Sequence, residues 1–188
     1  MFFGSPAVVV RAKRSVLELY LPPKNQYYKL EIPQSAFNFM EVVDENSFVR
    51  HIFDFLIKLN KKTANVDLVL DSDVIFEKAM PATNEETDKA EIESFFSNIP
   101  LAQNNIATKT YIFNKQYFLY ATNKAYFSLI IRAFAKTGWG VNYVAPLSIF
   151  GFNAQNKVFG DDNLKVIRNG KKLALKINFL EEDTPKNG

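Results

Sequence analysis

Two aspartates, Asp71 and Asp73, are the residues best placed by type and spacing to do chemistry. A single serine separates them, and they follow directly after the apolar run Val66–Leu70. Carboxylate oxygens at the end of a buried strand are the ligands that hard divalent cations prefer. The competing interpretation is a hairpin turn with solvated acids, because the next residues, VIFEKAM, restart a strand at once.

The acidic pair resembles the DxD metal site of sugar-nucleotide glycosyltransferases. That resemblance implies that Asp71 and Asp73 hold a cation that neutralises a diphosphate leaving group. A nucleotide-binding βαβ region should precede such a site, and the chain supplies only one predicted helix there. We therefore keep the metal-dependent enzyme as the alternative, and expect no resident metal or other cofactor in the favoured interpretation.

The composition gives little support for other kinds of catalytic site. Cysteine is absent, which excludes disulfides, thiolate nucleophiles and cysteine-ligated zinc. His51 is the only histidine and lies in a predicted helix, so a Ser-His-Asp triad or a multi-histidine metal site would lack partners. Neither GxxxxGK[ST] nor GxGxxG occurs. Trp139, between two glycines after a predicted helix, is expected to plug that helix end against a sheet.

The charge balance argues against nucleic acid as a partner. The 188 residues include 23 basic and 20 acidic side chains, for a net charge of +3. Arg11, Lys13 and Arg14 form one predicted basic turn and Lys171 and Lys172 another, both expected to be solvated. No apolar run approaches the roughly 20 residues of a membrane span, and MFFGSPAVVV does not read as a secretory signal. We expect a cytoplasmic protein, which could lie peripheral to the inner membrane.

Periodicity predicts an α+β fold of mixed sheets with packed helices. Residues 6–33 are predicted to form a three-stranded meander whose last strand, YYKLEI, alternates apolar and polar residues, and residues 46–60 follow as an amphipathic helix. Two strands, 66–70 and 74–80, are predicted to form a hairpin around the acidic pair. Residues 1–82 are expected to form the N-terminal α+β subdomain.

The second half is predicted to begin with an inserted α+β subdomain over residues 83–151. It comprises a helix to about Ser97, a strand pair turning at Asn114-Lys115, a helix over 124–136 and a strand over 142–149. A C-terminal hairpin over 152–180 would turn at Asn169-Gly170. Residues 181–188 are expected to be a disordered polar tail.

The order of these pieces resembles that of PilM and GspL, actin-like cytoplasmic proteins of type IV pilus and type II secretion assembly. The resemblance rests on AVVVRAKRSVLELYL, DLVLDSDVIFEKAMP and the run from EIESFFSNIPL to SIFG, within residues 6–151. It implies an actin-like, ribonuclease H-like first half with an inserted small α+β subdomain. The family's DxG phosphate turn is replaced by Arg11-Ala12-Lys13, which implies a truncated, nucleotide-free relative that docks a cytoplasmic segment of a membrane partner.

Our favoured hypothesis is therefore a non-catalytic scaffold or interaction module. Tyr111, Tyr117 and Tyr120 are its candidate partner-binding residues, although strand alternation leaves open which way each one faces. The metal-dependent enzyme using Asp71 and Asp73 is one alternative. An ATP-binding actin-like protein, with basic residues in place of the phosphate turn, is another.

Overall fold

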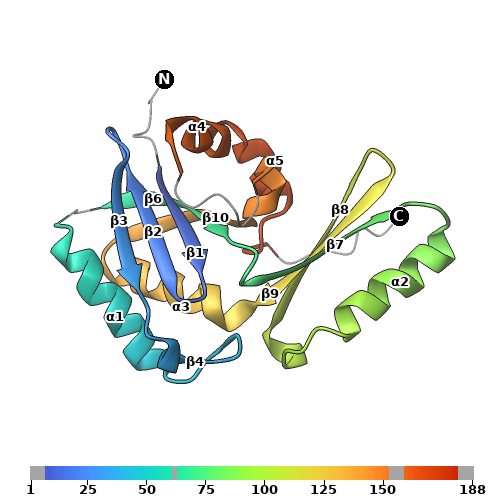
Figure 1. The fold of residues 1–188 in the computed structure, drawn as a ribbon, viewed down its shortest axis with the longest axis horizontal. Coiled ribbons are helices and arrows are strands. Elements are labelled where there is room, and N and C mark those ends of the chain that lie inside the picture. Colours follow the sequence, from blue (N-terminus) through green and yellow to red (C-terminus); the bar gives the residue numbers. More distant parts are fainter. Residues whose placement is uncertain (1–6, 61–62, 153–158, 182–188) are drawn as a thin grey trace.

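A computed structural model describes residues 7–60, 63–152 and 159–181 of the chain. Its centre is a five-stranded mixed sheet in the order β10-β6-β1-β2-β3 (Figure 1). The strands are β1 (Val8–Lys13), β2 (Val16–Leu21), β3 (Gln26–Glu31), β6 (Ala64–Leu70) and β10 (Trp139–Pro146). The first three pair antiparallel, as the predicted meander requires, and β6 and β10 run parallel to β1.

Helices cover both faces of this main sheet. On one face, α1 (Glu45–Lys58) and α3 (Lys124–Lys136) share a core with the alternate β1 residues Val8, Val10 and Ala12. On the other, α4 (Asp161–Asn169) and α5 (Lys171–Lys176) pack in a second cluster that contains Val9. Because both faces are buried, apolar residues predominate on both sides of the central strands, which carry the buried charged residues Arg11, Glu18 and Asp67.

A second, three-stranded antiparallel sheet extends from this body in the order β7-β9-β8 (Figure 1). It consists of β7 (Ile75–Pro81), β8 (Ile106–Phe113) and β9 (Gln116–Asn123), with α2 (Glu85–Ser97) lying along one face. Short elements complete the chain: η1 (Gln34–Ala36), β4 (Phe37–Asn38), β5 (Glu41–Val42), η2 (Gln103–Asn105) and η3 (Leu147–Phe150).

Side-chain caps define the starts of three helices. Asp44 accepts a hydrogen bond from the Ser47 amide at the start of α1, and the helix begins one residue before its predicted start at residue 46. Asn84 caps α2 and Asn123 caps α3 in the same way. The predicted helix over 124–136 is confirmed with the same limits.

The α+β class and the mixed sheets are as predicted, but two connections differ. The strands around Asp71 and Asp73 do not form a hairpin, because β6 belongs to the main sheet and β7 to the small one. The predicted inserted subdomain also extends too far, since α3 and β10 return to the main sheet. The insertion therefore comprises β7, α2, β8 and β9.

The predicted C-terminal hairpin is wrong, because residues 161–176 form α4 and α5. Leu164, Ile167 and Ala174 are buried at helical rather than alternating spacing. Gly170 has φ −77°, whereas a two-residue hairpin turn needs positive φ there. The predicted disordered tail lies, apart from residue 181, outside the described residues.

Candidate functional site

The carboxyl end of β6 places Asp71 in a buried ion pair with Arg11. Arg11 Nε and Nη2 each lie 2.5 Å from Asp71 Oδ2, and both side chains are buried. The second carboxylate oxygen, Oδ1, accepts the Ser72 amide at 2.7 Å. β1 and β6 are parallel neighbours in the sheet, which brings the arginine beside the aspartate. A cation at Asp71 would have to displace this guanidinium.

Glu18 and Lys13 extend this ion pair into a cluster. Glu18 lies directly across from Arg11 in the β1–β2 register, and its Oε2 is 3.4 Å from Arg11 Nη1. Lys13 Nζ is 3.4 Å from the other oxygen of Glu18. We call Arg11, Lys13, Glu18 and Asp71 the buried ionic cluster. Its two cations balance its two anions, as low-dielectric surroundings require.

Aromatic rings pack against the buried ionic cluster on the side that faces α4. The Arg11 guanidinium carbon is 4.8 Å from the centre of the Phe159 ring, a cation–π geometry. Tyr20 stacks on the same ring with centroids 5.4 Å apart, and its hydroxyl donates to Glu18 Oε2 at 3.3 Å. Burial raises the pKa of the Tyr20 hydroxyl well above its ordinary value, so it stays neutral.

The sequence prediction of a solvated basic turn at residues 11–14 is therefore wrong for Arg11. β1 continues to Lys13, and Arg11 is fully buried within it. The sequence contained a signal for this burial, because Arg11 lies between apolar residues, Val8 to Val10 and Ala12, in a strand that contributes to both cores. Its partner Asp71 could not be recognised before the order of the strands was known.

Asp73 is separate from the cluster and exposed. Its Oδ2 accepts the backbone N–H of Arg14 at 3.1 Å, so the acid stabilises the β1–β2 turn. Within the described residues, no group of three or more Asp, Glu, His or Cys side chains is arranged to hold a metal ion. The adjoining cavity has a volume of about 50 Å³, and Asp71, Ser72 and Ser148 are among its lining residues. That is room for one or two waters.

The other residues that the sequence singled out lie outside the buried ionic cluster. His51 is exposed on α1, and its Nε2 is 2.9 Å from the Glu31 carbonyl. Trp139 is buried, with its ring centroid 5.9 Å from that of Phe134 near the end of α3, as predicted. Lys171 and Lys172 are exposed at the start of α5 rather than in a hairpin turn.

The three candidate tyrosines divide between the two faces of the small sheet. Tyr111 pairs with Phe118 and Tyr120 pairs with Lys109, so these four share one face. Tyr117 pairs with Ile112 and Met80 and lies on the other. α2 covers this second face, as the 2.5 Å contact between Lys78 Nζ and Glu91 Oε1 shows.

The face of the small sheet away from α2 carries a group of aromatic side chains. We call the following residues the aromatic face: Ala79, Tyr111, Phe113, Phe118 and Tyr120. The rings of Tyr111 and Phe113 stack with centroids 6.3 Å apart, and Phe113 is 54% exposed near the tip of the hairpin. Tyr120 is buried at the base. Aromatic side chains therefore run from the body to the hairpin tip, and the polar residues Glu77, Lys109 and Gln116 share this face.

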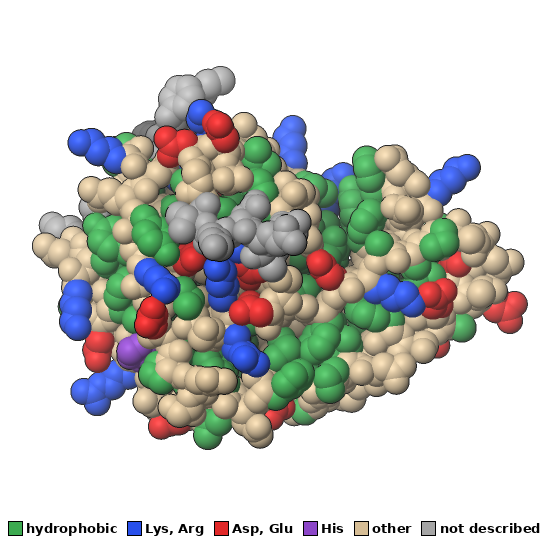
Figure 2. Space-filling view, in the orientation of Figure 1, with side chains coloured by type: hydrophobic (Ala, Val, Ile, Leu, Met, Phe, Trp, Pro, Cys, Tyr) green, Lys and Arg blue, Asp and Glu red, His purple; other side chains and the backbone are tan. Residues whose placement is uncertain are grey.

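A pocket of about 370 Å³ lies at the base of the aromatic face. It is lined by Glu77, Lys78, Ala79, Phe118, Tyr120 and Ser148. Ser148, from η3, donates to Glu77 Oε2 at 2.6 Å and links the two sheets. Burial and then the nearby Glu77 raise the pKa of Tyr120 to about 12. In Figure 2 the surface is hollowed between the main body and the small sheet, and hydrophobic side chains border the hollow.

No family model matches the sequence, and no curated protein matches it. Solved structures do share the fold. One is a PilM–PilN type IV pilus biogenesis complex, with a TM-score of 0.55 and 12% identity over 78% of this chain and 48% of that chain. The chain thus spans about half the length of that structure.

Two further structures score lower. One is the cytoplasmic domain of EpsL, an inner membrane component of the type II secretion system of Vibrio cholerae. It has a TM-score of 0.45 and 7% identity over 76% of this chain and 58% of that chain. The other is a Bacteroides thetaiotaomicron protein with an actin-like ATPase fold and unknown function. It has a TM-score of 0.46 and 13% identity over 77% of this chain and 52% of that chain.

The likeness is one of fold. Similarity to the PilM–PilN structure agrees with the predicted resemblance at that level. Within the described ranges, no helix is both long and apolar enough to cross a membrane.

Proposed function

We propose that this chain is a non-catalytic interaction module of a pilus- or secretion-like assembly. On this proposal it lies in the cytoplasm, peripheral to the inner membrane, and docks a cytoplasmic segment of a membrane partner. The observation that carries the proposal is the aromatic face, a surface rich in aromatic side chains with a pocket at its base. The shared fold with a protein of the PilM–PilN complex supports the choice of assembly.

The buried ionic cluster supports a non-catalytic role. Arg11 and Ser72 already engage both oxygens of Asp71, and Arg14 engages Asp73. The alternative enzyme would need both carboxylates free to bind a cation in the same site. Separating Arg11 from Asp71 would leave a buried guanidinium with fewer partners, which is costly in a low-dielectric interior.

The aromatic face is suited to an apolar peptide segment. Phe118 and Ala79 would receive one aliphatic anchor in the pocket, and the stacked Tyr111 and Phe113 would cover the neighbouring residues. Aromatic side chains dominate protein interfaces because they bury a large area with few rotatable bonds. The neutral Tyr120 hydroxyl can donate a hydrogen bond to a peptide carbonyl at the base.

Synthetic peptides test this proposal. They would copy the cytoplasmic segments of membrane proteins encoded beside this chain's gene, and their binding would be measured by fluorescence anisotropy. Phe118→Ala should weaken binding by at least about tenfold, as expected for an interface anchor. Ile112→Ala is the matched control, because Ile112 is 57% exposed on the face that α2 covers.

Two titrations measure the alternatives directly. Calorimetry with Mg-ATP tests the nucleotide-binding alternative, and manganese titration of the wild type against Asp73→Ala tests the metal-dependent enzyme. Tight binding of either ligand, with no peptide bound, would reverse our preference. A flat trace for both, together with peptide binding that depends on Phe118, would support the docking module.

A further inference from the structure

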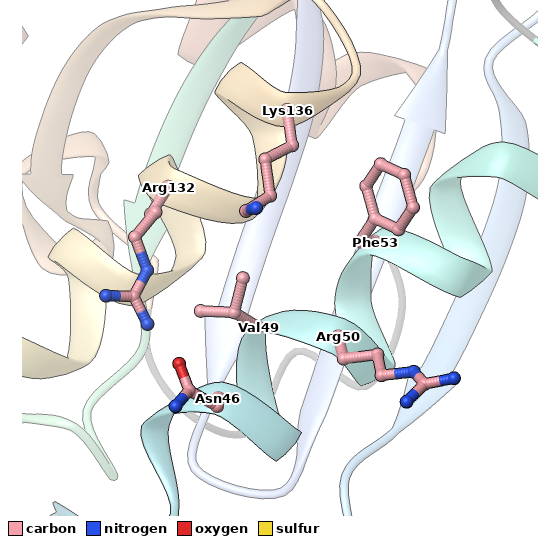
Figure 3. A pocket seen from close by; sticks show the side chains of 6 residues that line it. All are labelled: Asn46, Val49, Arg50, Phe53, Arg132 and Lys136. Atoms are coloured by element: carbon pink, nitrogen blue, oxygen red, sulfur yellow. The ribbon is translucent and has the colours of Figure 1, made fainter.

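A groove between α1 and α3 forms a second concave surface, remote from the small sheet. Its volume is about 620 Å³. It is lined by Asn46, Val49, Arg50, Phe53, Arg132 and Lys136 (Figure 3). The four α1 residues recur at helical spacing and so follow one side of that helix, and the two α3 residues are one turn apart.

The floor of the groove is apolar. Val49 lies between the two helices and is buried, while the half-buried Phe53 ring stands beside it (Figure 3). One turn further along α1, Ile57 is 56% exposed. An aliphatic or aromatic side chain entering from outside would therefore find hydrophobic contacts along two turns of α1.

The rim of the groove is cationic. Lys136 extends from α3 into the gap between the helices and Arg132 extends from α3 toward Asn46, whereas Arg50 points outward from α1 (Figure 3). The acids near these cations bind them weakly, since Arg132 Nη1 is 3.7 Å from Glu45 Oε2 and Arg50 Nε is 3.8 Å from Asp54 Oδ2. All four side chains are exposed, and such pairs contribute little. An incoming carboxylate can replace them.

We infer that this groove docks an acidic, amphipathic segment of a protein partner. Its aliphatic residues would pack on Val49 and Phe53, and its carboxylates would pair with Arg132 and Lys136. A concave surface between two helices suits a peptide rather than a flat bilayer, and Lys136 is directed across the groove (Figure 3). The inference does not depend on peptide docking at the aromatic face.

A displayed library of random peptides tests the inference without knowledge of the partner. The peptides would be as long as α1, 14 residues, and selected on the immobilised full chain. Enriched sequences should combine several acids with aliphatic residues. Their affinity, measured by fluorescence anisotropy, should fall at least about tenfold in Arg132→Glu/Lys136→Glu, because the rim charges reverse. Added salt should weaken binding further.

Three controls make the result decisive. Lys165→Glu/Lys172→Glu changes the net charge equally on α4 and α5, across the sheet, and should leave affinity unchanged. Phe118→Ala should also leave it unchanged, which separates this groove from the aromatic face. Lys136→Glu alone keeps the Arg132–Glu45 pair and serves if the double variant does not fold.

The inference is overturned if the enriched peptides lack acids or bind the double variant as tightly as the wild type. It is also overturned if the double variant loses only its binding to phosphatidylglycerol vesicles. That last result would assign the groove to an anionic membrane instead.

Discussion

Replacing Asp71 by alanine is the sharpest test of the buried ionic cluster. The substitution removes both 2.5 Å contacts to Arg11 and leaves a fully buried guanidinium with Glu18 as its remaining charge partner in the cluster. Breaking a buried pair in this way costs about 3–5 kcal/mol. In a chain of this size, 3 kcal/mol corresponds to a fall in Tm of roughly 6–12 °C.

Urea unfolding followed by circular dichroism measures this loss. Asp73→Ala is the matched control, because Asp73 is exposed and its carboxylate accepts the Arg14 amide at 3.1 Å rather than an arginine side chain, so its loss should cost less than about 1 kcal/mol. A triple variant, Arg11→Met with Glu18→Gln and Asp71→Asn, should recover part of the stability by removing the buried charges together. If Asp71→Ala and Asp73→Ala unfolded at the same urea concentration, our account of the cluster would be refuted.

Three further predictions concern other residues. Burial raises the pKa of Tyr120 to about 12 and that of Tyr126 well above its usual value. The unfolded chain therefore loses these protons first, and stability present below pH ~10 should fall as the pH rises toward 12, as urea unfolding across that range would show. Tyr120→Phe should lessen the fall. Asn123→Ala removes the α3 cap and the 3.0 Å bond to the Met40 carbonyl, which should cost about 1–3 kcal/mol by urea unfolding; a loss under 0.5 kcal/mol would count against it. Gly138 has φ +79° after α3, so Gly138→Ala should lower stability by about 1–2 kcal/mol in the same assay, and an unchanged midpoint would contradict the strain argument.

Local signals in the sequence predicted the helices of the first two-thirds well. The predicted helix ending near Ser97 and the predicted helix over 124–136 are both present, and Asn84 and Asn123 cap them. The positive φ angles at Asn114 and Lys115 confirm the predicted β8–β9 turn. In each case the decisive interactions lie within a few residues of one another.

The sequence also held enough information to divide the tyrosines between the two faces of the small sheet. A two-residue turn at Asn114-Lys115 fixes the register, so Phe113 pairs with Gln116 and Tyr111 with Phe118. Tyr111 and Tyr117 must then lie on opposite faces. Which face α2 covers depends on the packing of the insertion, and no local pattern gives that.

The failures arose where distant residues decide the structure. Gly170 suggested a hairpin turn, yet a Cβ placed there would lie 2.6 Å from Phe150 Cε1, so the glycine provides room for an aromatic ring. Arg11 and Asp71 are 60 positions apart and meet only because β1 and β6 are parallel neighbours. Sequence periodicity reports burial, but it does not report strand order.

The route of the chain into and out of the small sheet has an evolutionary consequence. The chain leaves at Val74 and returns at Thr122, and the Thr122 hydroxyl donates to the Val74 carbonyl at 2.7 Å. Since departure and return are adjacent, the segment between them can be lengthened, exchanged or reduced to a short loop without rerouting a strand of the main sheet. A docking surface carried there is therefore free to diverge in specificity while the architecture that carries it stays constant.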